Sequence, residues 1–451
     1  MSKTKKTRKT SSRKRKKSRG RTLKKTFITI GLIAILGMGG YVAAECNGID
    51  DPVNFVAEKA MEKLGLVEPS DNSDAEEAVL PVNPLTGEGE EDGFDPDALN
   101  RRVAAFVVEN TPDARPQWGM DDPDYSPDII LQGEVEGGIT RTLWMYADYN
   151  KLPSQIGPMR SARPPYIRFS ELFDGIFIHW GQSSSKGDYI GANEVFQDDK
   201  VDHINQMTFD DTVGLYDRDG SRGVSAEHTG IVYGDKVPAA IKAKEFRTEP
   251  NDYTQLSFSP LPWLTTLQPA DTVRVNFSSQ TGWETTVWNY DPEDEMYHTE
   301  NFRNDLKRDN LLILYDDTEY IAKYDYMGVA GYTVVYCDYK FKGGKGQLLS
   351  RGRVKEIEWK VEDGQLMLID PELTEAAREK ARAEAEAAEA EGESTEDNAA
   401  DTDENAEAVD PESIVIPASL NVGKTWIGWI SANNGGNVEI LANGESTSTE
   451  G

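Results

Sequence analysis

The chain contains very little cysteine. Cys46 and Cys337 are its only two cysteines in 451 residues, and they lie far apart. This scarcity argues against a disulfide framework and against a cysteine metal site. Cys337 stands in an aromatic and β-branched run, residues 332–339, that predicts a strand, so we expect its side chain in the core.

Basic charge is scarce beyond the first 25 residues. The formal net charge is −31, and residues 1–25 hold about 14 Lys or Arg and no acid, which leaves about −45 on the remainder. A body this acidic is a poor binder of nucleic acid through its general field, although local basic pockets can survive. The basic tail could touch anionic lipid or nucleic acid, but its interpretation as a topology signal is favoured.

Only one long apolar run is present, at residues 26–44. A charge-free stretch of about 18 residues rises roughly 27 Å as a helix, enough to cross a hydrocarbon core. The basic flank should remain in the cytoplasm. We therefore predict a cytoplasmic tail at residues 1–25, a single transmembrane helix or signal segment at residues 26–45, and an extracytoplasmic body at the cell membrane.

The fate of this segment has three alternatives. An uncleaved anchor is favoured because the basic region is longer than a signal peptide needs. Val42-Ala-Ala44 also fits the small-residue pattern of a cleavage site, which allows cleavage after Ala44. Lipidation of Cys46 is the third alternative, although Glu45 stands where that processing requires a small residue.

The remaining chain divides by composition into four parts. Residues 46–97 are predicted to form a short amphipathic helix and an acidic linker. Residues 98–248 carry continuous apolar strands, such as residues 103–108, and a helix-like stretch at residues 166–172, which predict an α/β or α+β first domain. Residues 249–431 are mostly strand-like and predict a β-rich second domain with an acidic helical or disordered insertion at 371–413, after which the strand-like run at 420–430 should rejoin that domain. Residues 432–451 are expected to be a flexible tail.

Candidate site residues gather in three runs rich in Gly, Pro, Arg and Ser at the ends of predicted strands. Arginine presents planar, bidentate donors, so these runs could hold a carboxylate or a phosphate. The alternative is that Arg160, Arg163 and Arg168 pair with Glu134 or Glu136 inside the domain. The candidate ligand-binding residues are Arg115, Glu136, Arg141, Arg160, Ser161, Arg163 and His179.

Catalytic signals are weak. His179 lies beside a serine-rich loop, but no Gly-x-Ser-x-Gly elbow is present, and a structural histidine at a strand end is favoured over a base. Paired carboxylates at Glu134 and Glu136, or at Asp210 and Asp211, lie in no recognisable ion loop. We therefore expect no metal and no cofactor, with His179 and Glu136 as the only catalytic candidates.

The same runs resemble a known family. The segments Asn83-Pro-Leu-Thr-Gly87, Asn110–Gln117, Val135–Arg141 and Ile156–Arg163 are similar to motifs of the YerB-like family of bacterial envelope lipoproteins, a two-domain family of unknown function. Weaker matches are Phe177–Ser183, where Gln182 replaces a glycine, and Gly423-Lys-Thr-Trp426. The resemblance covers residues 83–431 and implies an exported, membrane-attached protein of two domains.

Two departures from the family pattern bear on chemistry. Gln132 stands where the family usually has Glu, and Ser225–Thr229 replaces an Ala-Pro-His-Asn-like run. Both weaken the case for a common catalytic acid. We therefore expect an extracytoplasmic protein that binds a polar or anionic small molecule, a cell-wall ligand or a protein partner, with His179 at the rim of the site. A cell-envelope hydrolase and a structural scaffold are the alternatives.

Overall fold

The computed structural model describes residues 81–251, 253–259, 267–281, 285–392, 410–442 and 445–446. The predicted tail, the membrane segment, Cys46 and the amphipathic helix lie outside these residues. Among the helices that are described, none is both long enough and apolar enough to cross a bilayer.

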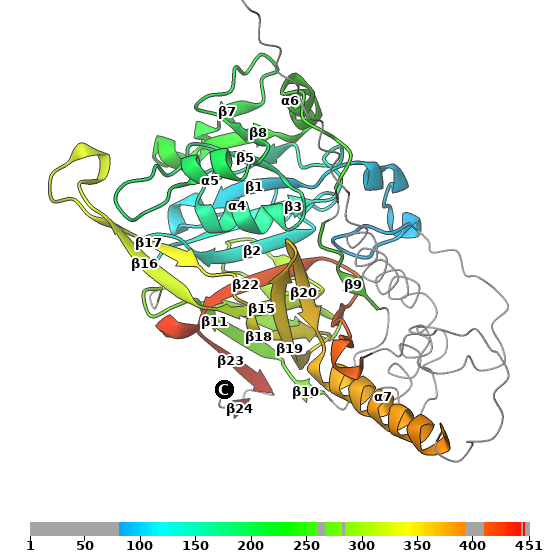
Figure 1. The fold of residues 1–451 in the computed structure, drawn as a ribbon. Helices are drawn as coiled ribbons and strands as arrows, with labels where there is room; N and C mark the ends of the chain where they lie inside the picture. The colour runs from blue at the N-terminus through cyan, green and yellow to red at the C-terminus, as the bar shows by residue number, and fades with distance from the viewer. Residues whose placement is uncertain are drawn as a thin grey trace, which may run out of the picture.

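One mixed sheet of eleven strands forms the centre of the molecule (Figure 1). Its middle strands are buried along their whole length, because their continuous apolar sequences are covered on both faces. In spatial order the strands are β10 (Gln268–Pro269), β19 (Arg353–Glu362), β18 (Gly344–Ser350), β15 (Asn310–Asp316), β22 (Thr425–Ser431), β2 (Ile129–Glu134), β3 (Thr140–Tyr146), β1 (Ala104–Glu109), β5 (Ile176–His179) and β6 (His203–Asn205), and β20 (Gln365–Ile369) pairs with β19.

Strand β22 joins the two predicted domains. It runs parallel to β2 on one side and parallel to β15 on the other. The expected strands of both halves are present, but the boundary near residue 248 does not separate two sheets. The two halves therefore share one sheet.

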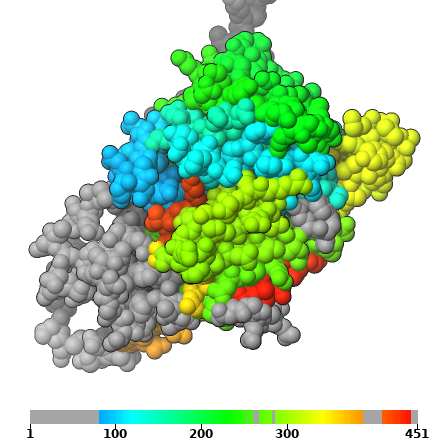
Figure 2. All heavy atoms as spheres, turned by 180° about the vertical axis from the view of Figure 1, so that it is seen from behind, coloured from blue at the N-terminus to red at the C-terminus, as the bar shows by residue number. Residues whose placement is uncertain are grey.

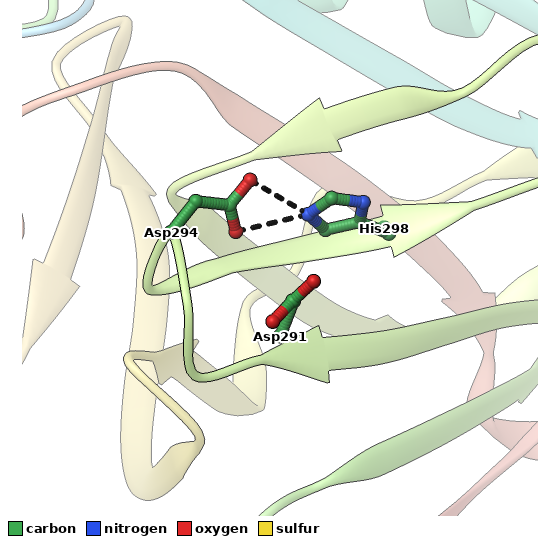
Figure 3. A group of neighbouring side chains, drawn as sticks. All are labelled: Asp291, Asp294 and His298. Atoms are coloured by element: carbon green, nitrogen blue, oxygen red, sulfur yellow. Dashed lines mark hydrogen bonds and ion pairs between the residues drawn. The ribbon is translucent and has the colours of Figure 1, made fainter.

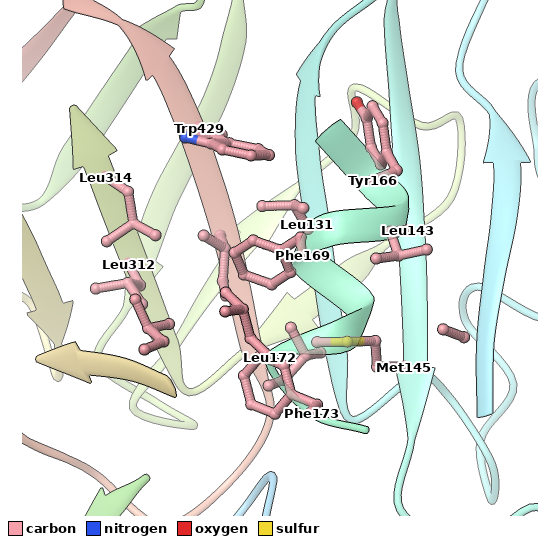
Figure 4. Packing of buried hydrophobic residues seen from close by; sticks show 14 of the residues in the cluster. Leu131, Leu143, Met145, Tyr166, Phe169, Leu172, Phe173, Leu312, Leu314 and Trp429 are labelled. Atoms are coloured by element: carbon pink, nitrogen blue, oxygen red, sulfur yellow. The ribbon is translucent and has the colours of Figure 1, made fainter. Parts of the chain in front are cut away.

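Two hydrophobic cores cover the two faces of this sheet. One face carries α4 (Pro164–Glu171) and α5 (Ala192–Asp198). Phe169 of α4 packs against Trp429 of β22 (Figure 4), and Phe196 of α5 packs against Phe177 of β5. Helix α4 begins with Pro164 and Pro165, whose fixed φ suits a first helical turn. Its apolar side, including Tyr166 and Ile167, is buried.

The opposite core lies beneath two smaller sheets and one helix. The six-stranded sheet consists of β14 (Leu306–Arg308), β13 (Met296–Thr299), β12 (Thr286–Asp291), β11 (Thr272–Asn276), β23 (Asn437–Ala442) and β24 (Glu445–Ser446). The three-stranded sheet consists of β4 (Gln155–Ile156), β8 (Gly230–Tyr233) and β7 (Tyr216–Arg218), and the helix is α6 (Val237–Ala243).

Three sequence expectations need correction. The tail is not wholly flexible, because β23 pairs with β11. The acidic linker ends earlier than residue 97, because Leu85 and Phe94 are buried in the body. The insertion begins as a helix, α7 (Pro371–Gly392), as expected, but Ala377 is buried, so this helix is not fully solvated.

The remaining elements are short. The two-stranded arm of β16 (Thr318–Lys323) and β17 (Val334–Tyr339) projects from the body (Figures 1 and 2). Strand β9 (Ser257–Phe258) pairs with β21 (Ser419–Leu420). The 3-10 helices are η1 (Glu90–Asp92), η2 (Pro96–Asn100), η3 (Pro112–Ala114), η4 (Gly220–Arg222), η5 (Ala226–His228), η6 (Gly234–Lys236), η7 (Tyr326–Gly328), η8 (Pro411–Ser413) and η9 (Ala432–Asn434).

Candidate functional site

Two of the predicted arginines meet at one carboxylate. Glu136 follows β2, and its carboxylate accepts hydrogen bonds from Arg141 Nη2 at 2.8 Å and from Arg163 Nε at 2.8 Å, with a further ion pair to Arg163 Nη2. Arg141 Nη1 also donates to the carbonyl oxygen of Ser161 at 2.6 Å. Both arginines are buried. The alternative of internal pairing with Glu136 is therefore confirmed for Arg163, and Arg141, which that alternative did not include, pairs with the same carboxylate.

The charges at this cluster are strongly coupled. Burial raises the pKa of Glu136, but the Arg141 and Arg163 cations lower it more, to about 2. Burial lowers the pKa of Arg141 to about 10, and the neighbouring Arg163 and Arg160 cations add to that lowering. The pKa of Arg163 is raised, because its attraction to Glu136 outweighs its burial. The two arginines shift in opposite directions because Glu136 compensates the burial of Arg163 but not that of Arg141.

A second carboxylate, Glu109 at the end of β1, lies beside the third arginine. Arg160 Nη2 lies 3.3 Å from Glu109 Oε1, and His228 Nδ1 lies 2.8 Å from Glu109 Oε2. Arg160 also reaches Glu227 Oε2 at 3.4 Å. Glu109 is almost fully buried, whereas the side chain of Glu227 is 60% exposed and that of Arg160 is 24% exposed. Arg160 is therefore the most exposed of the three arginines Arg141, Arg160 and Arg163.

Arg115 and Arg168 contact the second half of the chain. Arg115 Nη1 donates to the carbonyl oxygen of Asn301 at 2.7 Å, and Arg115 Nη2 donates to that of Asn110 at 2.8 Å. Arg168 Nη1 lies 3.4 Å from Asp338 Oδ1. These contacts hold the two halves together.

His179 is not at the rim of the arginine cluster. It is fully buried, with Nδ1 at 2.6 Å from the carbonyl oxygen of Gly181 and Nε2 at 2.9 Å from His203 Nδ1. Its ring stacks on Phe196 of α5 at a centroid distance of 5.0 Å. Burial lowers the pKa of His179 to about 3. The prediction of a rim position is wrong because α5 covers this end of β5.

The carboxylate pairs suggested by the sequence do not form. Glu134 accepts a hydrogen bond from Tyr320 Oη at 2.8 Å, apart from the ion pairs of Glu136. Asp211 accepts hydrogen bonds from the backbone nitrogens of Leu215 and Tyr216. Glu136, fixed by two arginines, and His179, fixed in the core, are not placed for acid and base roles.

Comparison with known proteins shows which chains this one is similar to. Residues 85–247 match the family model described as the N-terminal domain of a protein of unknown function, DUF3048. The putative lipoprotein YerB of Bacillus subtilis (strain 168) is 28% identical over 274 residues, covering 59% of this chain and 75% of the relative. The chain is therefore similar to the YerB-like family. The crystal structure of the YerB protein from Bacillus subtilis has the same fold, with a TM-score of 0.54, 23% identity, and coverage of 79% of this chain and 99% of that chain.

Within this YerB-like fold, Gln132 has a structural role. It is fully buried on β2; its Nε2 donates to Thr140 Oγ1 and to Thr286 Oγ1, both at 3.2 Å, and its Oε1 accepts from Trp426 Nε1 at 3.2 Å. The side chain is neutral and uses both of its polar atoms. It therefore links the two halves without bringing a charge into the core.

Sequence reasoning missed three residues of the YerB-like cluster. Glu109, Glu227 and His228 surround Arg160, and no spacing rule connects residues from β1, the segment after β4 and η5. The sequence signal for Glu227 and His228 was the segment Ser225–Thr229, which had been noted only because it departs from the family pattern. Its Glu and His are the two residues that reach the cluster.

A second polar group lies on the six-stranded sheet. Asp291, Asp294 and His298 place their potential ligand atoms within 4.8 Å of one another (Figure 3). His298 Nε2 is 3.0 Å from both Asp294 oxygens, and Lys307 Nζ is 3.0 Å from Asp294 Oδ2. Lys307 thus already supplies a cation, and the group is explained as an ion-pair network at a hairpin turn.

Proposed function

We propose that this YerB-like chain is a membrane-attached extracytoplasmic protein that binds an anionic ligand, a carboxylate or a phosphate, at Arg160. Support for attachment comes from the apolar run at residues 26–44 and from the relative's description as a putative lipoprotein. Support for the ligand comes from the charge balance of the arginine cluster.

Apart from the exposed Glu227, the cluster carries more positive than negative charge. Arg141, Arg160 and Arg163 face the two buried or half-buried carboxylates of Glu109 and Glu136. Burial lowers the pKa of Arg141, and the neighbouring Arg163 and Arg160 cations lower it further. An anion that approaches Arg160 would relieve the repulsion among the three guanidinium groups.

The observation that carries the proposal is the position of Glu227. Its exposed carboxylate lies 3.4 Å from Arg160, where an external carboxylate or phosphate would bind. An exposed ion pair is worth only about 0.2–1 kcal/mol, so displacing Glu227 costs little. A ligand oxygen that accepts charged hydrogen bonds from Arg160 gains about 1.5–3 kcal/mol for each bond. The carboxylate of Glu227 therefore lies at the position that we propose for the ligand.

The test is a thermal-shift and calorimetric titration of the full chain in mild detergent with inorganic phosphate and with citrate. Arg160→Ala should abolish binding, and Glu227→Gln should strengthen it because the competing carboxylate is gone. Arg274→Ala is the control, since Arg274 also forms an ion pair with an exposed glutamate, Glu439, on the six-stranded sheet. An anion at 100 times its dissociation constant adds about 2.7 kcal/mol of stability.

Three results decide against the proposal. The first is that neither anion shifts the wild type or Glu227→Gln. The second is that Arg160→Ala binds as well as the wild type. The third is that Arg274→Ala loses binding to the same extent as Arg160→Ala, which would indicate a general charge effect.

A further inference from the structure

The arm of β16 and β17 carries an unusual concentration of exposed apolar side chains. Within the described residues, five of the nine large hydrophobic side chains that are exposed lie on it. They are Tyr324, Met327, Val329, Tyr332 and Val335. Met327, at the end of the arm, is 83% exposed. Apolar patches of this kind mark contact with a protein or a membrane.

The arm is also nearly free of charge at its tip, although the chain as a whole is strongly acidic. Between Lys323 and Val334 the only acidic or basic residue is Asp325, whose Oδ1 accepts a hydrogen bond from the backbone of Gly331. Lys323 and Lys186 stand at the base, where Lys186 Nζ donates to the carbonyl oxygen of Asp325 at 3.3 Å. Along the arm from its base to its tip, the side chains are therefore first lysine, then tyrosine, and then methionine and valine.

This order matches the layers of a bilayer surface. Tyrosine rings favour the headgroup region, lysine stems reach back to it, and methionine and valine favour the acyl region. We infer that the tip of the arm, residues 324–333, inserts into the outer surface of the membrane to which the chain is attached. The inference rests on the proposed function, because it requires a body held outside that membrane.

Three observations favour a bilayer over a second copy of the chain. The tip is convex and projects beyond the body (Figure 2), so it is shaped to enter a surface and not to receive a partner. Two copies with a formal charge of −31 each repel one another, whereas the tip itself carries only the single acid Asp325. The segment between the apolar run and the body, residues 45–82, spans at most about 130 Å, which leaves the arm within reach of the membrane.

The arm is held firmly at its base. Tyr336 of β17 stacks on Tyr189 at 4.1 Å and lies under the guanidinium of Arg163 at 5.3 Å. Lys323 Nζ donates to the carbonyl oxygen of Ser184 at 2.6 Å. A tip on a fixed base can set the orientation of the body above the bilayer.

The test uses the full chain reconstituted into vesicles of phosphatidylethanolamine and phosphatidylglycerol. Met327→Cys and the control Met207→Cys are each spin-labelled, and a wild-type sample labelled in parallel gives the signal of the native cysteines for subtraction. Met207 is the matched control because it is an exposed methionine of the body, 67% exposed. Accessibility to oxygen, which concentrates in lipid, is compared with accessibility to a water-soluble nickel chelate.

Insertion predicts that the label at position 327 gains oxygen accessibility and is several-fold less accessible to nickel than the label at position 207. Equal nickel accessibility at the two positions overturns the inference. Low accessibility to both reagents at position 327 also overturns it, because that result indicates contact with another protein chain. Flotation of the unlabelled chain with the vesicles tests attachment separately: a chain that does not float overturns both proposals, and one that floats with a water-exposed label overturns only the insertion.

Discussion

Replacing Glu136 with Gln should destabilise the fold by about 3 kcal/mol at neutral pH. The folded environment lowers the pKa of this carboxyl from 4.5 to about 2, a difference worth about 3 kcal/mol at roughly 1.36 kcal/mol for each tenfold change in proton affinity. Gln keeps the shape of the side chain but leaves Arg141 and Arg163 without a carboxylate. Removing one partner from a buried ion pair costs a similar amount, about 3–5 kcal/mol.

The pH dependence of this loss follows from the sign of the shift. Because the folded pKa lies below the unfolded one, the stabilising contribution of Glu136 is complete above about pH 4.5 and is lost as the pH falls toward about 2. The stability difference between wild type and Glu136→Gln should therefore shrink in acid. Urea unfolding of both chains, followed by tryptophan fluorescence from pH 7 down to about pH 3, measures it.

Glu227→Gln is the matched control for this experiment. Its carboxylate also contacts an arginine of the cluster, but it is exposed, so its loss should cost less than about 1 kcal/mol. The reasoning is refuted if Glu136→Gln costs no more than Glu227→Gln at neutral pH. It is refuted equally if the cost of Glu136→Gln does not change with pH.

Two further predictions test the local structure around the site. Gly138→Ala should destabilise the chain more than Gly137→Ala in thermal unfolding. Both glycines have positive φ, but only at Gly138 would an added Cβ collide with the carbonyl oxygen of Gln280. Equal losses of stability in the two variants would contradict this prediction. The imidazole of His179 should remain neutral down to about pH 4, since its pKa is about 3; an NMR titration that shows protonation near pH 6 would refute the buried assignment.

Much of the fold could be predicted from local sequence patterns. The apolar run at residues 103–108 predicted a strand covered on both faces, and β1 is buried along its whole length. The helix-like stretch at 166–172 corresponds to α4, which begins two residues earlier because Pro164 and Pro165 suit its first turn. These elements were predictable because periodicity and proline act over a few residues.

Long-range pairing was not predictable in the same way. The strand-like run at 420–430 was expected to rejoin the β-rich half, but β22 pairs with β2 of the first half as well as with β15. The segment containing β23 was expected to be loose because Gly, Asn and Ser surround it, yet its register with β11 makes it part of a sheet. Both outcomes depend on which edge a strand meets, and local composition does not specify that.

The arginine-rich motifs differ from one another in what they do. Arg115 reaches the backbone of Asn301, Arg168 reaches Asp338, and Arg163 lies against Tyr336, so all three contact the second half of the chain. Runs rich in Arg, Gly and Pro can therefore hold two halves of a fold together. The sequence alone does not distinguish this structural role from ligand binding. Arg160 differs because its partner on the outer side, Glu227, is exposed. The exposure of this partner carboxylate, and not the density of arginine, is our reason for proposing Arg160 as the position where a ligand competes.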